Sequence, residues 1–482
     1  MDDRPHKLTY ALEARERPLR ELLLLAVPTV AQMASYTLMQ FADRWMLAYV
    51  GDLQATAAGT AGIVYFCVIG FGFGVLLVVN TFASQSFGRC DYRSAGRYLW
   101  QGLWFGVAFG LAAMLLYPVA QSLFLKMGHP LPVATLEADY LRVLTLAGSL
   151  KLASTALSQF LMGIHRPMVV FLAAASGVVI NLFFNWIFIY GHWGFPAMGV
   201  AGAAWGTNAA VLVELLVMAA YVAAPAMVRT FNTLDWKLRW DMQRTLLRVG
   251  LPAGFQLICD VAAWTVFLNI IMVSFGTAAL SANSFAFTYM HMSFMPAIGV
   301  GAAVTALVGK YIGMKRYDLA ERRAHLGFFV CAIYMVVCGA MFFLFRNDLI
   351  RLFSNDPQVL RIGAVTMIFV AAYQIFDAMF IVYVGALRGA GDTLVPAAVQ
   401  AVLVWTIVVG GGFATTRYAP QYGVSGPWTL ATLFGALLGF YLLLRFKRGR
   451  WKSIRLHPDE PIPTAQLAAD SITASNSLQA TD

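Results

Sequence analysis

The chain has 482 residues, of which 60% are hydrophobic and only 12% are charged, and its formal net charge is +10. This balance excludes an ordinary soluble domain and indicates a polytopic membrane protein. The apolar stretches are long and lack the alternation of a membrane barrel, so the predicted fold class is an all-α polytopic membrane protein.

Twelve apolar segments follow one another along the chain, each long enough for a transmembrane helix. They span residues 20–49, 55–82, 97–119, 138–160, 168–191, 199–225, 247–275, 280–308, 324–345, 361–386, 394–416 and 426–445. When the connections are assigned alternately to two sides, 26 Lys and Arg residues fall on the side of the N-terminus and 6 on the other. The positive-inside rule therefore predicts that both termini are cytoplasmic. Because loops explain the basic charge, we expect no nucleic-acid partner.

The first segment contains a proline near its start, Pro28, and a carboxylate near its end, Asp43. A helix of this length exceeds the hydrocarbon core of about 30 Å, so a tilted helix can hold Asp43 inside the boundary. Ionisable groups in lipid are costly and tend to mark ion or substrate pathways. Asp43 is therefore a candidate site residue, although Arg44 follows it and an interfacial ion pair is the alternative interpretation.

An internal repeat relates the two halves of the chain. Three groups of residues recur at an offset of 224 or 225: Pro28 and Gln32 as Pro252 and Gln256; Gly88, Tyr92, Ala95, Arg97 and Gly102 as Gly313, Tyr317, Ala320, Arg322 and Gly327; and Pro196, Gly199, Val200 and Gly202 as Pro420, Gly423, Val424 and Gly426. Six segments per half place both halves in the membrane in the same direction. This predicts two six-helix lobes related by a pseudo-twofold axis along the membrane normal.

The predicted division of the chain follows from the repeat. It comprises a cytoplasmic N-terminal segment (1–19), an N-lobe (20–225), a cytoplasmic inter-lobe linker (226–246), a C-lobe (247–445) and a disordered cytoplasmic tail (446–482). The tail after His457 is rich in Ser, Thr, Ala and Asp and offers little to bury.

Four acids in the apolar segments are candidate site residues: Asp43, Glu214, Asp260 and Asp377. Gln256 precedes Asp260 by four residues and Gln374 precedes Asp377 by three, so each amide shares a helix face with its acid. A buried carboxylate beside an amide is suited to hold a proton or a bare cation. A structural pairing inside the protein is the alternative for each of them, and for Glu214 the two interpretations are evenly balanced.

Asn181 and Asn185 are spaced by four residues in the fifth segment, so their amides point the same way. Such amides are more often interhelical hydrogen-bond partners than ligands. Thr207, in the next segment, carries no signal by itself. The sequence contains no HExxH, nucleophile elbow or P-loop and no Cys or His pair at metal spacing, so we expect neither an enzyme nor a bound cofactor. Transport would then be driven by an ion gradient.

Several motifs together resemble the multidrug and toxic compound extrusion (MATE) family, and in particular its bacterial NorM-like branch. They are the early proline and later Asp43 of the first segment, QSFGRCDYRSAGR with its repeat GKYIGMKRYDLAERR, NLFFNWIFIYGHWGFPAMGVAGAAWGT, LPAGFQLICD, and ALRGAGDTLVP. The resemblance covers residues 18 to 445. It implies twelve helices in two lobes that export cationic and amphipathic drugs in exchange for sodium or protons.

The resemblance also implies which residues bind the cation. Asp43, Asn181, Asn185 and Thr207 match the N-lobe cation site of the family, and Asp377 matches its acid in the tenth helix. Asp260 stands where the NorM-like branch has a glutamate, and with Gln256 and Gln374 it completes a C-lobe cation or substrate site. Asn185 stands where proton-coupled relatives often have Asp, so Na+ and H+ both remain open as the coupling ion.

The family also implies a multi-pass protein of the plasma (inner) membrane, in contact with membrane lipid, which we expect to be a monomer binding drug-like organic cations. A flippase for lipid-linked precursors is the alternative within the related families. It would favour an interior rich in Arg for pyrophosphate, where this chain offers only Arg142 and Lys151 near the ends of one segment. A membrane-embedded enzyme would need convergent His or acid groups, and the seven His residues are dispersed.

Overall fold

The computed structural model describes residues 17–456. Residues 1–16 of the predicted N-terminal segment and residues 457–482 of the predicted disordered tail lie outside the described range. Within that range the chain forms helices and no strand.

The helices follow the predicted apolar segments closely. In chain order they are α2 (Pro18–Ala48), α3 (Asp52–Leu76), α4 (Val78–Gly88), α5 (Tyr92–Ala113), α6 (Ala120–Lys126), α7 (Leu131–Leu146), α8 (Gly148–Gly163), α9 (Pro167–Tyr190), α10 (Val200–Val222), α11 (Pro225–Phe231), α12 (Trp240–Val266), α13 (Thr277–Gly313), α14 (Tyr317–Leu344), α15 (Arg346–Arg351), α16 (Pro357–Gly389), α17 (Leu394–Leu403), α18 (Gly411–Tyr418) and α19 (Ser425–Lys447). Two π-helical stretches, Phe267–Ile271 and Val404–Gly410, continue α12 and join α17 to α18.

Eleven of the helical stretches in the described range are long and apolar enough to cross a membrane, against twelve predicted. The difference lies at the predicted segment 138–160, where the structure has two helices, α7 and α8, of 16 residues each. The chain leaves helical geometry between them at Ala147, with φ −96° and ψ 9°. Each piece alone is too short to span the hydrocarbon core.

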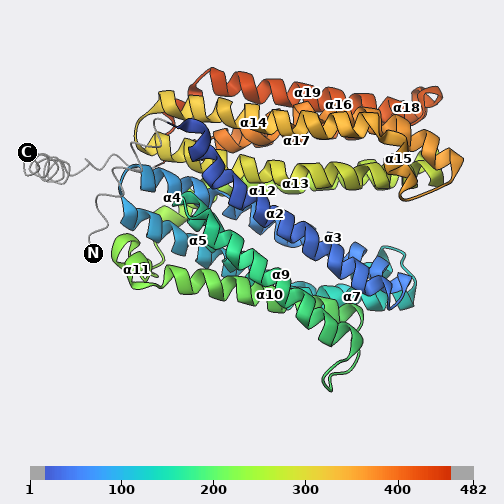
Figure 1. The fold of residues 1–482 in the computed structure, drawn as a ribbon, viewed down its shortest axis with the longest axis horizontal. Helices are drawn as coiled ribbons and strands as arrows, with labels where there is room; N and C mark the ends of the chain where they lie inside the picture. The colour runs from blue at the N-terminus through green and yellow to red at the C-terminus, as the bar shows by residue number, and fades with distance from the viewer. Residues whose placement is uncertain (1–16, 457–482) are drawn as a thin grey trace, which may run out of the picture.

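The helices form two groups that lie side by side (Figure 1). The hydrophobic core of the C-lobe is built mainly from α13, α14, α16 and α19. The N-lobe has three clusters: one around α3, α4, α5 and α8, one around α3, α7, α9 and α10, and a small one of Met39, Val178 and Ala210 on α2, α9 and α10. The start of α2 and the end of α19 lie at the same end of the molecule, which we call the termini end (Figure 1).

The first helix of each lobe contributes to the core of the other lobe. Leu22, Leu25 and Ala26, at the start of α2, belong to the C-lobe core. In the same way Leu246, Val249 and Ala253, at the start of α12, belong to the N-lobe core. Pro252 lies within the exchanged stretch of α12, and Pro28 follows the exchanged stretch of α2. The two lobes therefore hold each other at the termini end by a reciprocal exchange of helix starts.

Glycines allow the lobes to approach closely where α3 meets α12. A Cβ added at Gly74 would lie 2.7 Å from the Cα of Gly254, and one added at Gly254 would lie 2.7 Å from the carbonyl oxygen of Phe71. Real side chains do not fit at such distances, so two backbones touch here. Small residues are the usual means of close helix packing in membranes.

A buried ion cluster also joins the lobes at the termini end. Glu21 of α2 is 3% exposed and accepts hydrogen bonds from Lys310 Nζ at 2.9 Å and Arg323 Nε at 2.7 Å. The hydroxyl of Tyr311 donates to the same carboxylate at 2.8 Å. Lys310 and Arg323 come from α13 and α14. The negative charge of Glu21 on α2 is therefore neutralised by C-lobe residues.

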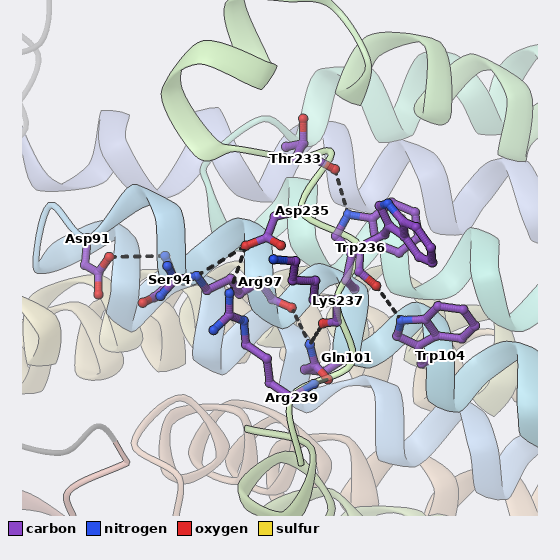
Figure 2. A network of polar contacts seen from close by, with 11 residues as sticks. Asp91, Ser94, Arg97, Gln101, Trp104, Thr233, Asp235, Trp236, Lys237 and Arg239 are labelled. Atoms are coloured by element: carbon purple, nitrogen blue, oxygen red, sulfur yellow. Dashed lines mark hydrogen bonds and ion pairs between the residues drawn. The ribbon is translucent and has the colours of Figure 1, made fainter. Parts of the chain in front are cut away.

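The linker between the lobes is bonded to α5, as Figure 2 shows. Trp100 donates to the carbonyl of Thr233 at 2.7 Å, and Trp104 donates to the carbonyl of Trp236 at 2.9 Å. Gln101, which is fully buried, donates to the carbonyl of Lys237 at 3.1 Å. The linker is extended here, so its carbonyl groups form no hydrogen bonds within a helix. The side chains of α5 satisfy these carbonyl groups instead.

The described part of the predicted disordered tail is ordered. Residues Arg450–Ser453 form a short helical turn, and Trp451 is 1% exposed, with its ring 5.0 Å from that of Phe446. The surface pair of Lys452 with Glu321 at 2.6 Å connects this turn to α14.

The close backbone contact predicts a position-specific effect of side-chain volume in α3. Gly74→Val should lower stability by about 1–3 kcal/mol, because the added methyl groups force the lobes apart or strain the helices. Thermal unfolding of the purified protein in one detergent measures this. Gly62→Val is the matched control, since it lies on the same helix with nothing within 4 Å of an added Cβ. Equal effects of both variants would contradict the contact.

Candidate functional site

The four residues predicted for the N-lobe come together around the carboxylate of Asp43. Asp43 lies on α2 and is 9% exposed. Asn185 Nδ2, on α9, donates to Asp43 Oδ1 at 2.5 Å, and the Thr207 hydroxyl, on α10, lies 3.5 Å from Asp43 Oδ2. Asn185 Nδ2 also lies 3.2 Å from Asn181 Oδ1. Three helices thus converge on a single carboxylate.

Local sequence explains how the three helices approach. Asn181 and Asn185 are one turn apart on α9 and both are fully buried, as their spacing predicts. Gly206 precedes Thr207 on α10, and a Cβ at that position would collide with Asn185 Oδ1. The glycine therefore lets α10 bring the Thr207 hydroxyl to Asp43. The carbonyl oxygen of Ala203 lies 3.1 Å from the same hydroxyl and competes with Asp43 for its single proton.

The environment of Asp43 is rich in oxygen atoms and has no direct cationic partner. Asn185 Oδ1 is buried and accepts no hydrogen bond within the described chain. The alternative interpretation of Asp43 was an ion pair with Arg44. No such ion pair forms among the described residues. An amide oxygen without a donor beside a carboxylate is the kind of group that a bare cation can coordinate.

The C-lobe acid Asp260 is bonded through a residue that the sequence did not single out. Gln400 of α17 donates through Nε2 to Asp260 Oδ1 at 2.8 Å. Gln256 in turn donates to Gln400 Oε1, so the predicted pairing of Gln256 with Asp260 is indirect. A single amide within the apolar segment 394–416 was the signal that could have identified Gln400.

The second predicted C-lobe pair, Asp377 and Gln374, lies deep in α16. Asp377 is 4% exposed, and no hydrogen bond joins it to another described residue. Gln374 is 1% exposed, and both its Nε2 and its Oε1 are buried without a partner in the described chain. Asp377 is close enough to Asp260 for the two charges to interact. The two acids therefore share the C-lobe interior with an unsatisfied amide.

Chemically, both lobes offer carboxylates surrounded by amides, hydroxyls and aromatic rings. Among the described residues no group of three His, Cys, Asp or Glu side chains could hold a metal ion. The arrangement suits reversible binding of a monovalent or organic cation, because it supplies buried carboxylates that no Lys or Arg side chain of the described chain pairs with.

A protein-family model described as MatE matches residues 28–187 and 252–411. Among curated proteins, a "Probable multidrug resistance protein NorM" from Thermotoga maritima is 25% identical over 443 residues, covering 90% of this chain and 93% of the relative. A protein of the same name from Mesorhizobium japonicum is 27% identical over 439 residues, covering 89% and 94%. The "Multidrug resistance protein MdtK" of Edwardsiella ictaluri is 28% identical over 425 residues, covering 86% and 91%.

Solved structures with similar folds include a MOP superfamily transporter from Pyrococcus furiosus, with a TM-score of 0.82, 20% identity and coverage of 90% of this chain and 96% of that one. The eukaryotic MATE transporter AtDTX14 aligns with a TM-score of 0.80 and 18% identity, covering 90% and 97%. At these identities the similarity establishes the two-lobed helical fold.

The bond from Asn185 to Asp43 predicts energetic coupling between the two positions. Asn185→Leu should destabilise the protein by about 1.5–3 kcal/mol, because it removes a donor from a buried carboxylate. In an Asp43→Asn background the same change should cost clearly less, because no carboxylate is left unsatisfied. Thermal unfolding of the single and double variants measures the coupling.

Asn269→Leu serves as the control for the loss of an amide, since Asn269 is exposed and bonds the Thr265 carbonyl of its own helix. Additive effects of Asp43→Asn and Asn185→Leu would show that the two side chains do not interact.

Proposed function

The chain belongs to the MatE family, and on this basis we propose that it is a secondary active multidrug efflux antiporter, exporting cationic and amphipathic compounds in exchange for an ion by alternating access. The names of its relatives, multidrug resistance proteins, support multidrug efflux. The observation that carries the proposal is Asp43, a buried carboxylate with amide and hydroxyl neighbours and no ion-pair partner in the described chain.

We propose Na+ as the coupling ion. Around Asp43 the available ligands are oxygen atoms of Asn181, Asn185 and Thr207, including Asn185 Oδ1, which has no donor. Sodium is a hard cation that binds oxygen ligands, whereas a proton needs only the carboxylate itself. A neutral amide at position 185 also has no proton to pass to Asp43.

Alternating access requires two states in which opposite ends of the molecule are closed. In the present structure the termini end is closed by the exchanged helix starts, the contact of Gly74 with Gly254 and the Glu21 cluster. With cytoplasmic termini, as the distribution of Lys and Arg predicts, this is the outward-facing state. An ion can drive the change only if it binds the two states with different affinities.

The flippase alternative receives less support from the interior charges. A pyrophosphate group calls for several convergent Arg or Lys side chains. Arg142 pairs with Asp139 at 3.3 Å, and Lys151 lies over the ring of Tyr36. The two side chains have separate neighbours and form no basic cluster in the described chain, so an organic cation remains the better substrate.

Loss of a site carboxylate should impair export. In bacterial cells lacking their main efflux pumps, Asp43→Asn, Asp260→Asn and Asp377→Asn should each reduce the export rate of a fluorescent organic cation such as ethidium, by about tenfold for each ~1.4 kcal/mol of lost binding. Asp348→Asn is the control, since Asp348 lies on the surface beside Arg351. Full export by all three site variants would refute the site assignment.

The coupling ion can be tested separately in proteoliposomes. An imposed sodium gradient at uniform pH should drive uptake or release of the labelled cation, and a pH gradient without sodium should not. In the Asp43→Asn variant the response to sodium should disappear, because the carboxylate that neutralises the ion is gone. Transport driven by the pH gradient alone would identify the proton as the coupling ion instead.

A further inference from the structure

A second polar layer lies below the Asp43 site in the N-lobe. Tyr36 precedes Asp43 by seven residues on α2, and Glu214 follows Thr207 by seven residues on α10. On α9, Gly177 precedes Asn185 by eight residues. Seven residues are about two helical turns, or roughly 10.5 Å. Helices α2 and α9 run away from the termini end and α10 runs towards it. Tyr36, Gly177 and Glu214 therefore all lie nearer the termini end than the Asp43 layer does.

The three helices meet again at this layer. The Tyr36 hydroxyl donates to Glu214 Oε2 at 3.2 Å, and Glu214 is 1% exposed. A Cβ at Gly177 would lie 2.7 Å from Glu214 Oε1, so only a glycine leaves room for this carboxylate on α9. The layer is therefore built around Glu214 as the layer above it is built around Asp43.

Gln32 adds an unsatisfied acceptor to this layer. Its Nε2 lies 3.5 Å from the Tyr36 hydroxyl, one helical turn away on α2. Its Oε1 is buried and has no hydrogen-bond partner in the described chain, and the whole residue is only 3% exposed. A buried acceptor without a donor is costly and indicates a missing partner.

A lysine side chain occupies the face of the Tyr36 ring. Lys151 Nζ, from α8, lies 4.8 Å from the ring centroid, a cation–π distance. Its charge acts on Glu214, yet no direct ion pair joins the two within the described chain. The ammonium group therefore stands where a positive charge is attracted by both the ring and the carboxylate, without a fixed bond to either oxygen.

We propose that Tyr36, Glu214 and Gln32 form a second binding position for the organic cation in the N-lobe, and that Lys151 is a resident cation which the substrate displaces. This inference rests on the proposed function and specifies where its substrate binds. The Tyr36 ring contacts the face of the cation, Glu214 supplies the negative charge and Gln32 Oε1 accepts any N–H group.

The chemistry of the layer favours an organic cation over an inorganic one. A weakly hydrated, delocalised cation gains from an aromatic face at little desolvation cost. A sodium ion would have to exchange its water for the ring, whereas the Asp43 layer offers it oxygen ligands. The two layers can therefore hold different cations, with the coupling ion at Asp43 and the substrate at Glu214.

Lys151, as a competing cation that is part of the chain, also helps the site to release its substrate. When the substrate leaves, Lys151 returns to the ring and neutralises Glu214, so no unpaired charge is left in the interior. Without the lysine, departure of the substrate would expose a bare carboxylate to a low-dielectric environment. The cost of holding Lys151 away from the ring lowers the affinity for substrate and thus speeds release.

Binding of radiolabelled tetraphenylphosphonium to the purified protein in lipid nanodiscs tests the inference. Lys151→Met should raise the affinity about three- to tenfold, because the competitor is removed from the ring face. Glu214→Gln should lower it by a similar factor. The assay is best run at about pH 8, so that a proton does not replace the missing lysine on Glu214.

Matched variants separate a binding role from a structural one. Lys151→Arg keeps a cation over the ring and should leave the affinity unchanged. Tyr36→Phe keeps the ring and should bind the probe, whereas Tyr36→Leu should bind it weakly. Thermal unfolding shows whether each variant is folded. If Glu214→Gln does not fold, the affinity of Lys151→Met alone is sufficient for the test.

An affinity that Lys151→Met leaves unchanged or lowers, in a protein whose wild type binds the probe, would overturn the second site and leave the antiporter proposal standing. Failure of the wild type to bind any organic cation, or to export one from cells, would instead refute the proposed function and with it the second site.

Discussion

A carboxylate buried among membrane helices must be neutralised or hydrogen-bonded by the protein itself, and the structure depends on how each acid meets this requirement. Glu21 is satisfied completely, by Lys310, Arg323 and Tyr311 of the C-lobe. Asp43 is bonded only by amide and hydroxyl groups. The first arrangement holds the lobes together, and the second leaves a negative charge for which a mobile cation can compete.

The reciprocal exchange of helix starts connects these two kinds of acid. Helix α2 carries Glu21 in the C-lobe core and Asp43 in the N-lobe, with Pro28 between them. Any movement of the lobes must therefore bend α2, slide it against α13 or break the Glu21 cluster. A proline removes one backbone hydrogen bond and makes bending at that point easier. The proposed ion site at Asp43 and the contacts that close the termini end therefore lie on the same helix.

Much of the fold could be predicted because hydrophobicity and length determine it directly. The all-helical, multi-spanning class and nearly all helix positions follow from runs of apolar residues. The segment 138–160 was predicted as one helix, since its composition gives no sign of the break at Ala147. The grouping of Asp43 with Asn181, Asn185 and Thr207 came from family resemblance, because residues on three separate helices have no relation that spacing could reveal.

Sequence alone determined that the chain lies in a membrane, where its acids fall and which amides share a helix face with them, since these depend on composition and on local helical geometry. Only the tertiary structure decided which acids are neutralised. Glu21 was not among the predicted site residues and proved to be buried, while Gln400 proved to stand between Gln256 and Asp260. The reason is that the partner of a buried charge is chosen by helix packing, which joins residues hundreds of positions apart and leaves no trace in the local pattern.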